Sequence, residues 1–196
     1  MIPDHFDNFR IILASRSPRR QQLLKEAGLK FDIAIKEYPE TFPEGLDGKA
    51  TAEYISYQKA SLFKGELSAS EIVITADTIV WCNNKILGKP VDYDDAFHIL
   101  EEISGNIHEV ITGVTFLSSV KEKTFSVSTR VTFDALSDAE IKYYIDEFKP
   151  YDKAGAYGIQ EWIGLVACTS IEGSYFNVVG LPVQTLYKEL KKFINE

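Results

Sequence analysis

The sequence predicts a mixed α/β fold in which helices flank a sheet. Patterns typical of strands alternate with amphipathic helical patterns, and no repeat or low-complexity segment interrupts them. The 196 residues suffice for one sizeable core and are too few for two ordinary domains. Apolar residues make up 45% and charged residues 26%, the balance of a globular protein. We therefore expect residues 1–196 to form a single domain that can divide into two lobes.

The predicted elements of the first half follow the order strand, helix, helix, strand and helix. They are FRIILAS (residues 9–15), SPRRQQLLKEAG (17–28), TAEYISYQKASLF (51–63), EIVITADTIVW (71–81) and VDYDDAFHILEEIS (91–104). Ser17 is a typical helix cap, Pro18 is typical of the first helical position, and Gly28 marks the end of that helix. β-branched residues favour the strand at 71–81, and Asp92 caps the helix after it.

The second half predicts a hairpin, a helix, a loop, a strand and a last helix. These segments are residues 108–133, SDAEIKYYIDEFKP (137–150), YDKAGAYGIQEWIG (151–164), LVACTSI (165–171) and the residues from Pro182 onward. Alternating apolar residues on either side of VKEK predict the hairpin. Ser137 and Glu140 form a capping-box pattern, and glycines punctuate the loop.

Charge and composition exclude several classes of partner. The net charge of −8 argues against binding to a nucleic acid polymer or to an anionic membrane, so any basic site must be local. Cys82 and Cys168 match no metal spacing and are expected to be reduced thiols. The N-terminus lacks a basic stretch followed by an apolar run, and no run of about 18 apolar residues occurs elsewhere. We expect a cytoplasmic protein.

Arg19 and Arg20 lie in the first turn of a predicted helix, where the helix dipole is already positive and disfavours a cation. The same position offers free N–H donors, the hydroxyls of Ser15 and Ser17, and guanidinium groups that match phosphate oxygens. This arrangement predicts a site for a phosphate-bearing ligand. The alternative is that both arginines lie in solvent.

Asp77 interrupts a strand in which every neighbour is expected to be buried. A buried carboxylate needs a partner, so the candidates are Mg²⁺, a nearby cation, or a role in proton transfer beside Thr78. The alternative is an aspartate that caps a β-bulge at a strand end.

Lys59 lies on the apolar stripe of a predicted helix, where it either meets an anion or extends along the surface to water. Lys89 and Lys153 lie in short loops, where functional sites are commonly assembled. Glu40 lies in a proline-rich loop and is either a second metal ligand or an exposed acid. The P-loop, dinucleotide-binding and G-x-S-x-G patterns are absent from the sequence.

The chain resembles the Maf family of nucleotide pyrophosphatases. Six blocks carry this resemblance in order along the chain: LASRSPRR (13–20), ADTIV (76–80), LGKPVD (87–92), SGNIHEVITGV (104–114), DKAGAYGIQ (152–160) and GSYFNVVGLP (173–182). The resemblance implies a fold related to the inosine triphosphate pyrophosphatases, with a cleft between two lobes. It also implies hydrolysis of a nucleoside triphosphate to the monophosphate and pyrophosphate with a divalent metal, usually Mg²⁺ and alternatively Mn²⁺.

The resemblance also assigns roles by position. Asp77 resembles the family's catalytic acidic residue and is expected to bind the metal together with Glu40. The positions linked to specificity are Arg19, Thr78 and Gln160. The residues expected to contact phosphate are Ser15, Arg20, Lys59 and Lys89. Ser17 and Lys153 complete the expected substrate-binding set.

The block AGAYGIQ is similar to the branch of the family that acts on dTTP and UTP, rather than the branch that acts on 7-methyl-GTP. That branch usually continues Gln-Gly, whereas Glu161 and Trp162 follow Gln160 here, which leaves the base preference open. Modified nucleotides are a further candidate substrate, and a second copy of the chain is a candidate partner in a homodimer. The alternative function is a nucleotide-sensing regulator of cell division that binds without turnover. The acidic balance disfavours an RNA-binding module.

Overall fold

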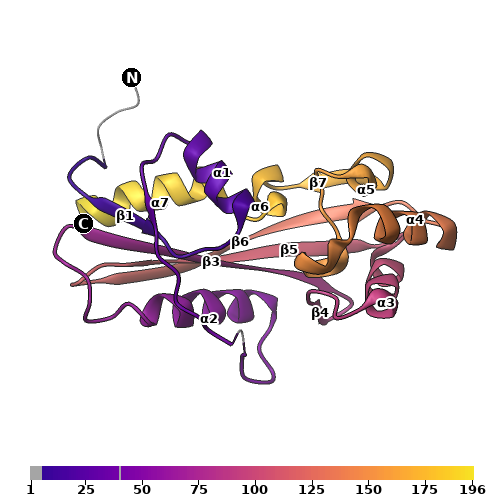
Figure 1. Ribbon diagram of the computed structural model, residues 1–196, viewed down its shortest axis with the longest axis horizontal. Coiled ribbons are helices and arrows are strands. Elements are labelled where there is room, and N and C mark those ends of the chain that lie inside the picture. The colour runs from indigo at the N-terminus through magenta and orange to yellow at the C-terminus, as the bar shows by residue number, and fades with distance from the viewer. Residues whose placement is uncertain (1–5, 40) are drawn as a thin grey trace. The chain divides into compact units, whose positions relative to one another are not determined.

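Figure 1 shows the computed structural model, which describes residues 6–39 and 41–196. The strands are β1 (Arg10–Leu13), β2 (Asp32–Ile33), β3 (Glu71–Cys82), β4 (Lys85–Leu87), β5 (Ile107–Leu117), β6 (Glu122–Phe133) and β7 (Cys168–Glu172). The α-helices are α1 (Pro18–Glu26), α2 (Gly48–Ser61), α3 (Tyr93–Ile103), α4 (Asp138–Phe148), α5 (Trp162–Val166), α6 (Tyr175–Val179) and α7 (Val183–Asn195). Short 3₁₀ helices occupy Pro150–Asp152 and Ala154–Ala156.

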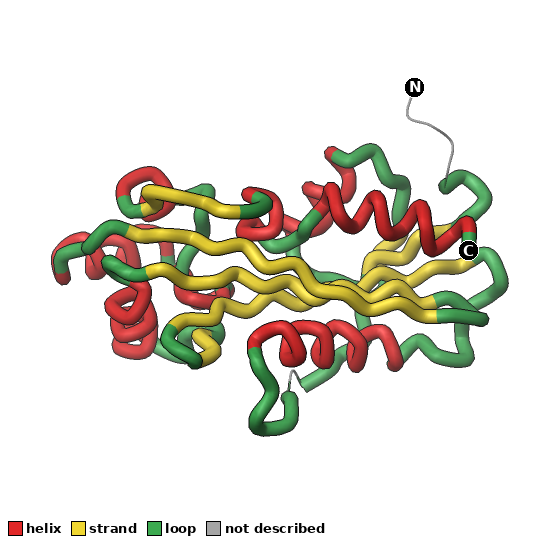
Figure 2. Tube along the Cα trace, turned by 180° about the vertical axis from the view of Figure 1, so that it is seen from behind, coloured by secondary structure: helices red, strands yellow, loops and turns green. Residues whose placement is uncertain are grey.

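The strands form a seven-stranded mixed sheet in the order β2-β1-β3-β5-β6-β7, with β4 paired to β3. Strand β1 runs parallel to both β2 and β3, whereas β4 and β7 run antiparallel to β3 and β6. The pairing of β1 with β3 extends from Arg10 opposite Glu71 to Leu13 opposite Ile74. Helices flank these strands in Figure 2. The predicted mixed sheet with flanking helices is therefore confirmed.

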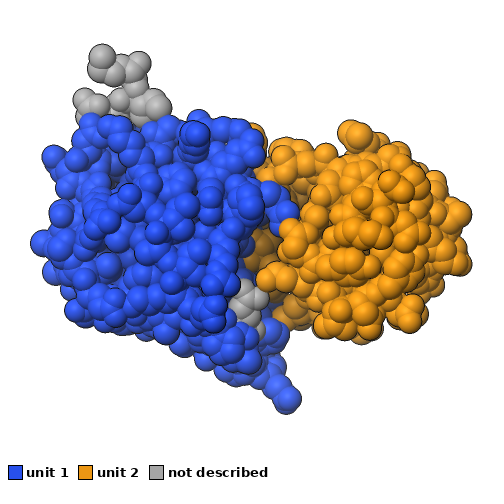
Figure 3. All heavy atoms as spheres, in the orientation of Figure 1, with its two compact units in different colours: residues 1–77, 112–127, 180–196 blue, residues 78–111, 128–179 orange. Residues whose placement is uncertain are grey.

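The chain divides into two compact units, which Figure 3 distinguishes by colour. Unit 1 contains residues 1–77, 112–127 and 180–196, and unit 2 contains residues 78–111 and 128–179. The divisions fall inside the long strands β3, β5 and β6, so each of these strands contributes residues to both units. The units are described separately below.

In unit 1, α2 covers one face of the sheet and α1 and α7 lie on the other (Figures 1 and 2). Helix α2 approaches β5 closely at Gly113. A Cβ atom on this residue would stand 2.2 Å from the carbonyl oxygen of Ala52. Only glycine fits such an approach. On the other side, the ring of Phe193 from α7 packs edge-on against Phe116 of β5.

The predicted start of α1 is confirmed. Ser17 caps the helix, and its side-chain oxygen accepts a hydrogen bond from the N–H of Arg20. Pro18 occupies the first helical turn, where its missing N–H costs nothing. Gly28 follows the helix with a φ of 76°, a conformation that favours glycine.

In unit 2, α3 packs against α4. The predicted capping box of α4 is confirmed. The side chains of Ser137 and Glu140 each accept a hydrogen bond from the backbone N–H of the other residue. The helix ends at Lys149, which adopts a left-handed conformation with a φ of 45° immediately before Pro150. Within residues 6–39 and 41–196, no helix is both long and apolar enough to cross a membrane.

The structure departs from the sequence predictions in its short elements. Strands β2 and β4 and helix α6 were not predicted, and α2 begins at Gly48 rather than at residue 51. Asn83 and Asn84 both adopt positive φ angles, of 48° and 61°, and form the tight turn that joins β3 to β4. Asparagine tolerates this conformation better than most residues, so the Asn-Asn pair was the signal for the turn.

The strand predicted for residues 165–171 was wrong at its first residues. Leu165 and Val166 belong to helix α5, and β7 begins only at Cys168. The apolar pair resembled a buried strand, but Leu165 is 82% exposed and Val166 is 47% exposed. Gly164 permits the helical turn, because a Cβ atom there would stand 1.9 Å from the carbonyl oxygen of Ile159.

Candidate functional site

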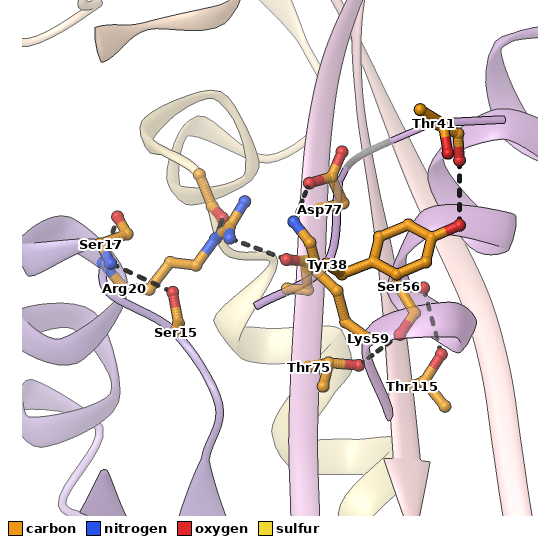
Figure 4. Close-up of polar contacts among 12 residues, drawn as sticks. Ser15, Ser17, Arg20, Tyr38, Thr41, Ser56, Lys59, Thr75, Asp77 and Thr115 are labelled. Carbon is orange, nitrogen blue, oxygen red and sulfur yellow. Dashed lines mark hydrogen bonds and ion pairs between the residues drawn. The ribbon is translucent and has the colours of Figure 1, made fainter. Parts of the chain in front are cut away.

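Asp77 lies in β3 at the end of the part of that strand that belongs to unit 1. Its carboxylate Oδ1 is 2.7 Å from the Nζ atom of Lys59, which comes from α2 (Figure 4). The two side chains are only 13% and 17% exposed. The partner of the buried Asp77 is thus a nearby cation, one of the predicted candidates. Lys59 in turn meets an anion and does not extend into solvent.

The pairing of α2 with β3 explains why these two side chains meet. The hydroxyl of Thr75 donates to the carbonyl oxygen of Ser56 at 2.7 Å, which fixes the helix against the strand. Thr75 and Asp77 lie on the same face of β3, since side chains alternate along a strand. Ser56 and Lys59 lie on the same face of α2, since residues three apart are neighbours on a helix. This buried hydrogen bond therefore contributes to the register that brings Lys59 to Asp77.

Arg20 extends from α1 to the main chain next to Asp77 (Figure 4). Its Nη1 donates to the carbonyl oxygen of Ala76 at 2.7 Å, and its Nε donates to the carbonyl oxygen of Gly180 at 2.9 Å. The guanidinium group therefore joins α1 to β3 and to the segment before α7. It also places a positive charge beside the peptide bond that precedes Asp77.

Ser15 and Ser17 lie at the start of α1, as predicted. The Oγ of the buried Ser15 accepts the N–H of Ser17 at 3.2 Å, and the Oγ of Ser17 accepts the N–H of Arg20 at 3.4 Å. Both hydroxyl oxygens act as acceptors here, so each hydroxyl keeps its proton as a donor for an anion. Arg19 is partly exposed, and the first turn of α1 contains no acidic residue. The helix start therefore retains the positive character that an anion site requires.

The remaining predicted residues belong to unit 2, apart from Glu40, which lies outside the described residues. Thr78 directly follows Asp77 in β3 and is partly exposed. Lys89 is exposed in the loop after β4, and Gln160 is exposed in the segment before α5. Lys153, unlike Lys89, is buried within its loop.

The surroundings of Lys153 include a residue whose role the sequence reasoning missed. Its Nζ lies 2.8 Å from Oδ1 of Asp152 and 3.1 Å from Oε1 of Glu161. Glu161 also accepts a hydrogen bond from the hydroxyl of Tyr144. The only signal was that Glu161 stands where glycine was expected, and this gave no indication of its partners.

The carboxylates of unit 1 fit one mode of metal binding. Among the residues that the structure describes, no group of three or more histidine, cysteine, aspartate and glutamate side chains could hold a metal ion by itself. Mg²⁺ is commonly held by one or two carboxylates together with water and the phosphates of a substrate. The single carboxylate of Asp77 beside a cationic helix start suits that mode.

Comparison with known proteins identifies a matching family and similar relatives. The model of a family described as Maf-like protein matches residues 10–193. A dTTP/UTP pyrophosphatase of Flavobacterium psychrophilum is 51% identical over 187 residues, covering 95% of this chain and 96% of its own. A dTTP/UTP pyrophosphatase of Phocaeicola vulgatus is 48% identical over 190 residues, covering 96% and 98%. The structure of a HAM1 protein from Coxiella burnetii has a TM-score of 0.49 at 14% identity, covering 94% and 99%. The sequence motifs and the match of the family model agree, and the chain belongs to the Maf-like protein family.

Proposed function

We propose that this chain hydrolyses nucleoside triphosphates, with dTTP and UTP preferred, to the nucleoside monophosphate and pyrophosphate. The observation that carries the proposal is the Lys59–Asp77 pair, held at 2.7 Å next to the peptide that Arg20 binds. Relatives at 51% and 48% identity over nearly the whole chain are named dTTP/UTP pyrophosphatases, which supports this reaction and these bases.

The triphosphate binds at the start of α1 in this proposal. The helix N-terminus supplies N–H donors and a positive dipole end, and Ser15 and Ser17 supply hydroxyl donors. Arg19 contributes a further positive charge from the first turn of the helix. Such a site stabilises the transition state mainly by position and charge, as in phosphoryl transfer generally.

Asp77 would hold Mg²⁺, or alternatively Mn²⁺, together with the phosphates, and Glu40 remains a proposed second ligand. When bound, such a metal neutralises phosphate charge and polarises a phosphoryl oxygen. The Asp77 carboxylate also has the chemistry of a general base that takes a proton from water. Lys59 fixes the orientation of that carboxylate from α2.

Water attacks the α-phosphorus in the proposed reaction. A new bond forms between the water oxygen and this phosphorus, and the bond from the α-phosphorus to the bridging oxygen of the β-phosphate breaks. Pyrophosphate leaves with the bonding electrons, and its charge is stabilised by Lys59 and Arg20. Lys89 remains a proposed phosphate-binding residue. The proton from water passes to a carboxylate, for which Asp77 is the candidate.

Residues of unit 2 would then select the base. The amide of Gln160 can both donate to and accept from the edge of a pyrimidine. Thr78 adds a hydroxyl next to Asp77 in the chain, and Lys153 remains a proposed substrate-binding residue. Specificity of this kind depends on hydrogen bonds that a wrong base would leave unpaired.

The test is a panel of nucleoside triphosphates, including dTTP, UTP, dCTP, dATP, dGTP and 7-methyl-GTP, assayed with and without Mg²⁺. Monophosphate and pyrophosphate should appear in equal amounts, fastest from dTTP and UTP and only with the metal. Orthophosphate as the first product would contradict the proposal. Tight nucleotide binding without any product would instead support the nucleotide-sensing alternative.

A further inference from the structure

The exposed Gln160 lies in a tight turn formed by residues 158–161. The N–H of Glu161 donates to the carbonyl oxygen of Gly158 at 2.9 Å, which closes the turn. Ile159 is buried on one side of the turn, and Gln160 is exposed on the other. The path of this turn therefore determines where the Gln160 amide stands.

A single hydroxyl group links both ends of the turn. The Oη of Tyr144 accepts the N–H of Gly158 at 2.9 Å and donates its own proton to the carboxylate of Glu161. Tyr144 is fully buried in α4, so the bridge is anchored to a regular element. Burial, together with the hydrogen bond to Glu161, raises the pKa of Tyr144, so the hydroxyl keeps the proton that it donates.

Glu161 points into this network instead of capping the helix that it precedes. It occupies the cap position of α5, yet its side chain makes no capping hydrogen bond there. Its Oε1 instead lies 3.1 Å from the ammonium group of Lys153. A Cβ atom on Gly158 would stand 2.7 Å from the carboxyl carbon of Glu161, so the glycine makes room for the inward carboxylate.

We propose that Glu161 is a positioning residue for base recognition, because it fixes the turn that presents Gln160. This inference rests on the proposed function, in which the Gln160 amide contacts the pyrimidine. Thymine and uracil present a hydrogen-bond donor and an acceptor at the two positions where cytosine presents an acceptor and a donor. An amide can rotate to match either pattern. A turn held in one place limits how the amide approaches the base and so favours one of the two patterns. Glu161 thereby acts on base selection and not on the reacting phosphorus.

The experiment compares Glu161→Gln and Tyr144→Phe with the parent chain and with Glu172→Gln. Glu172 is a matched control, because it is an exposed acid of unit 2 that pairs with Arg130 outside the turn. Each variant is assayed with dTTP, UTP and dCTP, and kcat and KM are determined separately. Folding is checked by thermal unfolding.

For Glu161→Gln and Tyr144→Phe, KM for dTTP and UTP should rise about 10-fold, roughly the value of one hydrogen bond to the base. The preference of kcat/KM for dTTP over dCTP should fall by a similar factor, while kcat with dTTP stays within about 2-fold. Glu172→Gln should match the parent. Unchanged KM and base preference in both variants would overturn the proposal, and so would an equal loss of kcat for every nucleotide.

Amide hydrogen exchange of residues 158–161 separates this proposal from the proposed function. Loss of the carboxylate should accelerate exchange at Gly158 and at position 161 in Glu161→Gln and leave it unchanged in Glu172→Gln. If the parent chain hydrolyses no nucleotide, the proposed function fails, and faster exchange would still support the role of Glu161 in fixing the turn. Unchanged exchange in Glu161→Gln would overturn that role whatever the activity.

Discussion

A lysine–carboxylate pair lies in each unit within a segment expected to be functional, and the two pairs differ in the elements that they join. Lys59 and Asp77 belong to α2 and β3, so the packing of a helix on a sheet brings them together. Lys153 and Glu161 belong to one loop, and Asp152 and Tyr144 add further partners. The first pair thus depends on tertiary packing, and the second depends on the path of a single segment.

The two pairs therefore have different proposed roles, the first in the reaction and the second in the path of a turn. The pair in unit 1 lies near the cationic start of α1 and contains the carboxylate that we propose takes part in the reaction. The pair in unit 2 belongs to a network that bonds the main chain at Gly158 and so defines a turn. Variants of the first pair should therefore change turnover, and variants of the second should change base preference.

The largest effect is expected for Asp77→Asn, which keeps the shape of the side chain and removes its charge. We expect kcat with dTTP to fall about 10³-fold, because the proposed metal ligand or general base is lost. Pyrophosphate release measures this loss. Glu161→Gln provides the contrast, since its kcat should stay near that of the parent. Parent-like turnover by Asp77→Asn would show that the reaction does not use this carboxylate.

A smaller loss is expected for Lys59→Met, which removes the cation from the same pair. We expect kcat/KM to fall about 100-fold, because a charge that stabilises the transition state and orients Asp77 is lost. The free energy of unfolding should also fall by about 2 kcal/mol, since the largely buried carboxylate loses its partner.

Chemical denaturation of Lys59→Met, Asp77→Asn and the double variant measures the coupling between the two residues. The double variant should be more stable than the sum of the single changes predicts. Simple additivity would mean that the ion pair contributes nothing to the packing of α2 on β3.

A pH-dependent effect of similar size is expected in unit 2. His108 is buried against Phe133 and Tyr157, and its Nε2 lies 2.7 Å from the hydroxyl of Tyr157. Burial lowers the pKa of His108 to about 4, below its unfolded value. The unfolded chain therefore binds a proton at a higher pH than the folded chain does, so stability falls as the pH drops through this interval. From pH 7 to 5 the loss from this group should be about 2 kcal/mol.

Denaturation of His108→Gln across this range measures that contribution. The variant should lose less stability than the parent between pH 7 and 5, whereas His98→Gln, at an exposed position, should behave as the parent does. An identical pH dependence of His108→Gln and the parent would contradict the assignment.

The smallest effect is expected for Ser17→Ala, which removes the cap of α1. The free energy of unfolding should fall by about 1 kcal/mol, as for other caps of this kind. Ser17→Asp separates the cap from ligand binding, because aspartate caps well but repels phosphate. We expect Ser17→Asp to retain stability and to raise KM for dTTP. A KM equal to that of the parent would place the triphosphate away from this helix start.

Local patterns in the sequence were enough to predict the elements that position the site in unit 1. The cap and proline at Ser17 and Pro18 predicted the start of α1, and the β-branched run around Asp77 predicted β3. The orientation of Lys59 stayed open because two faces of α2 had similar patterns. Contacts such as the hydrogen bond from Thr75 to Ser56 decide between them, and they join distant parts of the chain.

The parts that could not be predicted are long-range contacts and short elements. Arg20 bonds carbonyl groups at Ala76 and Gly180, and no local pattern indicates a main-chain acceptor so far along the sequence. The inward position of Glu161 depends on Tyr144 in another helix. The last two residues of α5 were predicted as part of a strand because Leu165 and Val166 are apolar although exposed.

The most direct measurement is hydrolysis of dTTP by the parent chain in water labelled with heavy oxygen, followed by mass spectrometry of both products. Attack on the α-phosphorus predicts that one labelled oxygen enters the nucleoside monophosphate and that the pyrophosphate stays unlabelled. Label in the pyrophosphate, or release of labelled orthophosphate, would contradict hydrolysis at the α-phosphorus by the site that contains Asp77.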